Sequence, residues 1–104
     1  MVIKQGDSLP DLVVDLSGQA GPEDLTSATG IRALGVRDGA LVVDRSVTGD
    51  AQGVVTMAWE GETSVPGLIG FEFEVTWPGG RKQTFPADGR EYVLVVPDAD
   101  GGSQ

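Results

Sequence analysis

The residues that come nearest to a catalytic arrangement are two glutamates, Glu72 and Glu74, in a segment of alternating apolar and polar residues. Residues two apart on a β-strand point to the same side, with Cα atoms about 6.5–7 Å apart. Paired carboxylates at such distances can hydrolyse glycosides, but one of them then needs a pKa raised by its surroundings. We expect both on the solvent side of their strand, and therefore interpret them as surface charges.

Two further acidic pairs have spacings that could hold a cation. Glu60 and Glu62 flank Gly61, while Asp98 and Asp100 open a stretch similar to a calcium loop. Such a loop needs further ligands at its fifth and twelfth positions, and the sequence ends before the twelfth. We interpret all four carboxylates as solvated charges and predict no metal site.

The residue types that are missing exclude most catalytic chemistry. The sequence contains no histidine and no cysteine, so it has no Ser-His-Asp triad, no Cys-His pair and no disulfide. Gly30 and Gly35 lack the flanking residues of a phosphate-binding loop. We predict no catalytic residues, no cofactor and no enzymatic activity.

Length and charge narrow the possible partners. A chain of 104 residues is expected to form one domain. Its 16 acidic residues outnumber its 7 basic ones, for a net charge of -9, which argues against nucleic-acid binding. No apolar run approaches the ~18 residues of a membrane span, and the N-terminus lacks the apolar core of a signal peptide.

Short segments of alternating apolar residues, separated by turn signals, predict an all-β fold. The clearest segment has five residues on one face, Ile69, Phe71, Phe73, Val75 and Trp77. In three other segments we expect the alternating apolar residues to face the core. These residues are Leu12, Val14 and Leu16; Leu41, Val43 and Val47; and Val55, Met57 and Trp59. Shorter strands are expected at 82–85 and 92–96. About seven antiparallel strands fit a single immunoglobulin-like β-sandwich, with a possible N-terminal arm at 1–10 and a flexible tail at 98–104.

Turn residues support this division of the chain. The pair Asp38–Gly39 suits the positive φ angles of a type I′ hairpin. Proline and two glycines at 78–80 permit a second tight reversal. Further breaks are expected at 65–67 and 88–89.

The segment 29–37 is harder to interpret, because Ile31 lies in the opposite phase to Leu34 and Val36. A bulge near Ala33 or Gly35 would bring the apolar residues to one side of a strand. A helix that starts at Pro22 is the alternative, although threonines and glycine weaken it. We favour the strand.

Several apolar residues lie in phases that are expected to face outward, which favours a protein-binding surface. The segment 92–96 is apolar on both faces, whereas a half-exposed antiparallel strand should alternate. An N-terminal arm could also add to the edge of a neighbour's sheet. The candidate interface residues are Val93, Val95, Val13, Val42, Lys4 and Gln5. We interpret Trp59 and Trp77 as core residues, although either could stack on a sugar.

Six stretches together resemble a phage protein family. They are KQGDSLP at 4–10, DLTSAT at 24–29, GVVTMAW at 53–59, PG at 66–67, FEFEVT at 71–76 and GRKQTFP at 80–86. In order and spacing they are similar to the N-terminal, immunoglobulin-like domain of phage baseplate upper proteins, a domain that also occurs alone in small virion proteins of tailed phages.

This resemblance implies a non-enzymatic structural protein of a tailed-phage virion, made in the bacterial cytoplasm. The expected partners are other virion proteins and further copies of the chain, in a capsid decoration, a head fibre base, a tail or a baseplate. The alternative function is a carbohydrate-binding β-sandwich on the virion surface, with Trp59, Trp77 or Tyr92 as a sugar platform.

Overall fold

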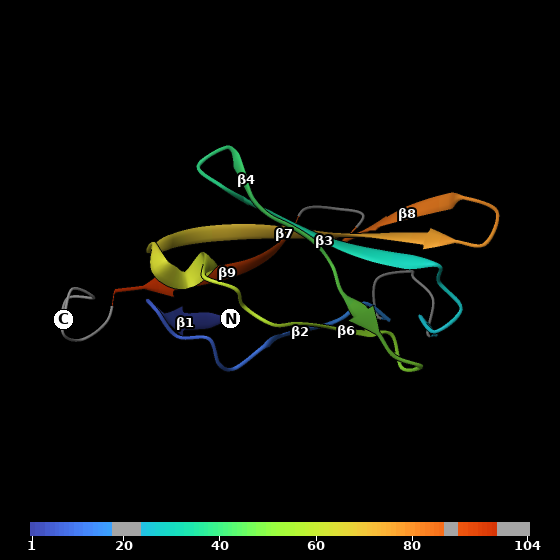
Figure 1. Ribbon diagram of the computed structural model, residues 1–104, viewed down its shortest axis with the longest axis horizontal. Coiled ribbons are helices and arrows are strands. Elements are labelled where there is room, and N and C mark those ends of the chain that lie inside the picture. The colour runs from blue at the N-terminus through green and yellow to red at the C-terminus, as the bar shows by residue number, and fades with distance from the viewer. Residues whose placement is uncertain (18–23, 87–89, 98–104) are drawn as a thin grey trace.

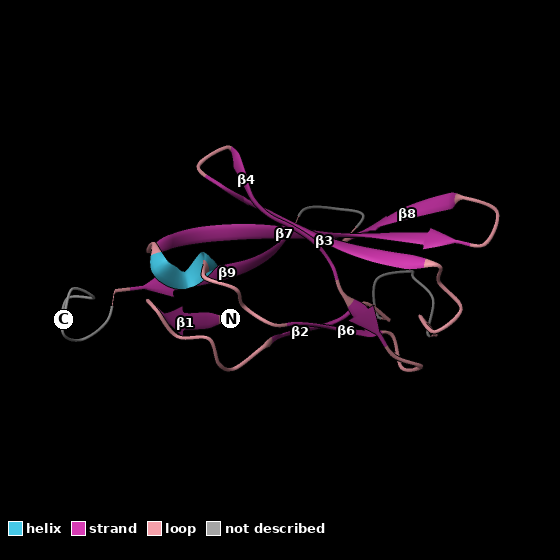
Figure 2. Cartoon of the chain, in the orientation of Figure 1, coloured by secondary structure: helices cyan, strands magenta, loops and turns pink. Residues whose placement is uncertain are grey.

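The computed structural model describes residues 1–17, 24–86 and 90–97. Within these ranges the chain forms nine strands and one short 3-10 helix, η1 (Figure 2). The strands are β1 (Val2–Lys4), β2 (Leu12–Asp15), β3 (Gly30–Arg37), β4 (Ala40–Ser46), β5 (Thr48–Gly49), β6 (Val54–Met57), β7 (Gly67–Trp77), β8 (Arg81–Phe85) and β9 (Glu91–Val96), and η1 is Glu62–Ser64. No helix in the described part of the chain is long and apolar enough to cross a membrane.

The strands form two sheets that face each other (Figure 1). The large sheet has the order β1-β9-β7-β3-β4, with β8 also paired to β7, and the small sheet has the order β2-β6-β5. This confirms the predicted all-β sandwich. The expectation of about seven antiparallel strands is too simple, because the described residues form nine and β1 runs parallel to β9. The two shortest strands, β1 and β5, carry too few residues to show an alternating pattern.

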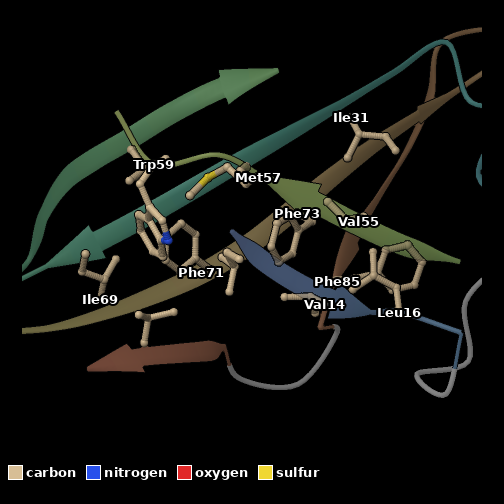
Figure 3. Close-up of a cluster of buried hydrophobic side chains, with 14 of the residues drawn as sticks. Val14, Leu16, Ile31, Val55, Met57, Trp59, Ile69, Phe71, Phe73 and Phe85 are labelled. Carbon is tan, nitrogen blue, oxygen red and sulfur yellow. The ribbon is translucent and has the colours of Figure 1, made fainter. Parts of the chain in front are cut away.

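The core lies between the two sheets and is built around β7. Ile69, Phe71, Phe73 and Val75 are completely buried, as their alternation predicts. Full burial of each such side chain contributes about 1.5–3 kcal/mol. Trp59 packs edge-on against Phe71, with ring centroids 5.9 Å apart. Figure 3 shows these side chains meeting others from the small sheet.

The irregularity expected in the segment 29–37 lies in its neighbour instead. Gly35 pairs with Val43 and Val36 pairs with Leu41, so Val42 is the extra residue of a bulge in β4. The pairing of β3 with β7 continues without a shift. A bulge near Gly35 therefore exists, but it does not turn the outward residues of β3 inward.

Regular alternation along β3 places its apolar residues on two faces. Ile31, Ala33 and Gly35 are buried in the core, whereas Leu34 and Val36 are half-buried on the other face of the sheet. The prediction of one inward set is wrong here, because β3 pairs with β7 without a shift and so keeps Leu34 and Val36 on the outer face.

The bulge also changes the orientation of residues in β4. Val43 is buried as expected, and Val47 is partly buried against the core. Leu41, which was expected to face inward, is 57% exposed. Val42 is partly buried against the core rather than free to form an interface.

The loops agree with the predicted turns where the structure describes them. Asp38 and Gly39 have φ angles of 53° and 79°, as a type I′ hairpin between β3 and β4 requires. Pro22 lies outside the described residues, and from Asp24 to Thr29 the chain forms turns rather than the alternative helix. The expected break at 88–89 and tail at 98–104 also lie outside the described residues.

Candidate interaction surface

Two of the predicted interface residues, Val93 and Val95, belong to the core. They are 0% and 1% exposed, because β9 is an inner strand of the large sheet between β1 and β7. Their side chains face the small sheet. The prediction that they meet a partner is therefore wrong, although the apolar character of both faces of this strand is real.

The opposite phase of β9 carries the exposed residues. Tyr92 is 50% and Leu94 is 41% exposed on the outer face of the large sheet. Leu94 lies directly opposite Leu68 on β7 and opposite Val2 on β1. Val2 and Leu68 are also at least half exposed. We call these four residues the outer-face patch.

The register makes the outer-face patch continuous across three strands. Side chains directly opposite each other on one face of a sheet are in contact range, so Val2, Leu94 and Leu68 form one row. Tyr92 lies opposite Gly70 in the next row. A Cβ atom at Gly70 would come within 3.0 Å of the Tyr92 ring, so the absent side chain leaves room for the tyrosine to lie over β7.

The N-terminal segment builds one edge of this patch. The Leu94 amide donates to the Met1 carbonyl at 2.9 Å, and the Gln5 amide donates to the Val96 carbonyl at 2.8 Å. The start of the expected arm is therefore a strand of its own domain rather than an addition to a neighbour's sheet. Lys4 is exposed on β1 at the border of the outer-face patch.

The remaining predicted interface residues lie elsewhere. The Gln5 side chain donates to the Ser64 carbonyl at 2.9 Å and connects the N-terminal segment to η1. Val13 is 60% exposed on β2 of the small sheet. The structure therefore does not bring the six predicted residues together into one surface.

Beyond the outer-face patch, the same face of the large sheet becomes charged. Glu72 pairs with Arg90 at 3.2 Å, and Glu74 lies 3.8 Å from Arg32 and 3.7 Å from Lys82. A hydrogen bond and the charge of the Asp44 carboxylate raise the pKa of Arg32. The two glutamates are surface charges, as predicted.

Glu60 and Glu62 share a cation, but it is a side chain of the protein. Arg45 Nη1 lies 2.9 Å from Glu60, and Arg45 Nη2 pairs with Glu62. The side chain of Glu62 is only 12% exposed, whereas that of Glu60 is 72% exposed. The interpretation as solvated charges is correct for Glu60 and wrong for Glu62. Within the described residues, no group of three acidic side chains could hold a metal ion.

The two tryptophans have different environments. Trp59 is buried, and its indole N–H donates to the Pro10 carbonyl at 3.0 Å, which confirms it as a core residue. Trp77 is only partly buried and lines a surface hollow on the β7–β8 hairpin. Core packing thus accounts for only part of the Trp77 side chain.

Comparison with protein-family models, with curated proteins and with solved structures finds no match for this chain.

The residues of the outer-face patch were missed because the apolar run at 92–96 does not show which of its two phases faces inward. One signal was available in the sequence. Tyr92 has a polar hydroxyl that favours a partly wet position, and Leu94 is in phase with it.

Proposed function

We propose that this chain is a non-enzymatic structural protein of a tailed-phage virion and that it binds other virion proteins through the outer-face patch. The observation that carries the proposal is the continuous apolar row of Val2, Leu94 and Leu68 with Tyr92 beside it. Contiguous exposed apolar surface commonly marks a protein-binding site. That the particle is a tailed-phage virion is inferred from the resemblance to the phage baseplate domain.

The strand arrangement supports the immunoglobulin-like part of the proposal. In that fold, a sheet with the central order C-F-G faces a sheet that contains B, E and D. Here β3, β7 and β9 are adjacent in the large sheet, and β2, β6 and β5 form the small one. The additional hairpin strand β8 comes between β7 and β9 only in the sequence; it pairs with the second half of β7, whereas β9 pairs with the first half.

Multi-copy binding suits a patch of this size. Four half-exposed side chains offer only modest apolar burial, so a single contact would be weak. Many linked copies on one particle raise the overall affinity through avidity. The net charge of -9 disfavours contact with packaged DNA, which favours an external position as a capsid decoration, a head fibre base or a tail component.

The proposal can be tested by replacing Leu94 with glutamate in the phage and counting copies of the chain in purified particles. We expect Leu94→Glu to reduce incorporation about tenfold or more, because the charge would be desolvated at the contact. Val13→Glu is the matched control, since Val13 is also an exposed apolar residue but lies on the small sheet.

Both variants should unfold at nearly the wild-type temperature, because both positions are exposed. Loss of incorporation in Leu94→Glu alone supports the proposed function. Wild-type incorporation of a folded Leu94→Glu protein would contradict it, as would an equal loss in Val13→Glu.

A further inference from the structure

A second surface feature lies at the turn of the β7–β8 hairpin, at the opposite end of the molecule from η1 in Figure 1. Five residues line a hollow there, which are Trp77, Pro78, Arg81, Lys82 and Gln83. We call it the hairpin hollow. None of these residues belongs to the outer-face patch, so the two surfaces can be tested separately.

The aromatic ring in the hairpin hollow is held in place. The Trp77 indole N–H donates to the Gln83 side-chain oxygen at 3.3 Å. This bond satisfies the single donor of the indole and leaves the Gln83 amide nitrogen, with its two N–H groups, for another acceptor. Fixing both side chains before a ligand arrives lowers the entropy cost of binding.

Positive charge is concentrated beside this ring. Arg81 is the cross-strand partner of Trp77, and among the described residues it forms no ion pair, unlike Arg32, Arg45 and Arg90. Lys82 is 60% exposed and lies 3.7 Å from Glu74. Arg37 also forms no ion pair in the described part of the chain, but its guanidinium donates to backbone carbonyls, whereas Arg81 is exposed.

We propose that the hairpin hollow binds a saccharide that carries a carboxylate group. The Trp77 ring offers an apolar face for the C–H side of a sugar ring, and the Gln83 amide can donate to its hydroxyl groups. Arg81 offers the forked N–H groups that bind a carboxylate in a bidentate manner. A long polyanion such as a nucleic acid is disfavoured by the negative charge of the remaining surface.

The test uses glucuronate as the probe and neutral glucose as its matched comparison, titrated into the ¹⁵N-labelled protein at low ionic strength. The indole N–H signals of Trp77 and Trp59 are followed by NMR spectroscopy. We expect glucuronate to shift the Trp77 signal but not that of buried Trp59. Its affinity should be about tenfold higher than that of glucose, as expected for one charge-assisted hydrogen-bond pair.

Two variants with the same change of charge identify the group responsible. Arg81→Gln should reduce the affinity for glucuronate to that for glucose. Lys4→Gln, which removes a positive charge from β1 at the border of the outer-face patch, should retain the preference.

Several results would overturn the proposal. One is equal binding of glucuronate and glucose by the wild-type protein, and another is an unchanged preference in Arg81→Gln. A third is acetate binding as tightly as glucuronate, which would indicate a simple anion site. The last is adenosine monophosphate binding more tightly than glucuronate, which would indicate a platform for nucleobases. None of these outcomes bears on incorporation into particles, so this proposal and the proposed function can fail independently.

Discussion

The side chain of Arg45 shows how one cation can hold a loop against a sheet. It projects from β4 to the two carboxylates that flank Gly61, and both it and Glu62 are largely removed from solvent. Glu62 also accepts a hydrogen bond from the Glu60 amide at 2.7 Å. The sequence around Gly61 predicts two solvated glutamates. It gives no sign of the ion pairs, because Arg45 lies 15 or more residues away in the chain.

Replacement of Glu62 should therefore destabilise the fold. We expect Glu62→Gln to lower the free energy of unfolding by about 1–3 kcal/mol, because the largely buried guanidinium of Arg45 would lose its buried carboxylate partner and keep only the exposed Glu60. Glu60→Gln should cost less than about 1 kcal/mol, as is usual for an exposed pair. Urea denaturation of both variants measures the difference, and equal stabilities would show that the Arg45–Glu62 pair is not structural.

A pH effect is expected at Asp15. The Ser17 hydroxyl and amide both donate to its carboxylate, at 2.6 and 2.9 Å, and these bonds lower the pKa of Asp15. A lowered pKa in the folded state contributes stability above the ordinary pKa, and that contribution is lost as the pH falls through the lowered value. The loss of folding stability through Asp15 is therefore expected below about pH 4.

Ser17→Ala should raise the pKa of Asp15 toward its ordinary value. The carboxyl ¹³C shift followed by NMR spectroscopy against pH measures this change. The pKa of Asp24, which is lowered in the same way by Thr26, provides an internal control and should stay low. An unchanged pKa of Asp15 in this variant would show that the Ser17 hydroxyl is not the cause.

At the scale of elements, the strands differ in whether their own sequence shows which face is buried. Strand β7 alternates so clearly that its inward set could be predicted from the sequence alone. Strand β9 could not be assigned, because its two phases are equally apolar and only its position between β1 and β7 determines which one is buried. The bulge at Val42 was also beyond prediction, since it depends on the pairing of β4 with β3.

A charged side chain should unfold the protein when placed on the buried face of β9 but not when placed on its exposed face. Val93→Glu would place a carboxylate in a completely buried position, so we expect loss of the cooperative thermal transition. Leu94→Glu, one residue along, should retain that transition. Circular dichroism measures both, and a stably folded Val93→Glu protein would show that β9 is turned the other way.

The close approach of β3 to the core gives a second prediction for an element. A Cβ atom at Gly35 would lie 3.0 Å from both Phe71 and Val43, whereas one at Gly30 would meet nothing within 4 Å. We expect Gly35→Ala to destabilise the protein by about 1–3 kcal/mol through overpacking. Gly30→Ala, at the start of the same strand, should change stability little. Chemical denaturation measures the stability of both variants. Equal stabilities would mean that the side chains around Gly35 can move to accommodate a Cβ atom.

For the whole molecule, the sequence predicted the two-sheet sandwich, because strand patterns and turns depend on local residues. The candidate binding surface could not be predicted in the same way. Val2, Leu68 and Leu94 come from three separate parts of the chain, and only the register of the large sheet makes them one surface. The six residues predicted for an interface instead divide among the core and its margin, the small sheet, the border of the outer-face patch and the contact with η1.

The central claim is that the outer-face patch is covered by another protein in the assembled particle. Electron cryo-microscopy of purified virions, with this chain located in the map, tests it most directly. We expect Val2, Leu68, Tyr92 and Leu94 to lie against a neighbouring virion protein or a further copy of the chain. A particle in which these four side chains face solvent, or one that does not contain the chain, would contradict it.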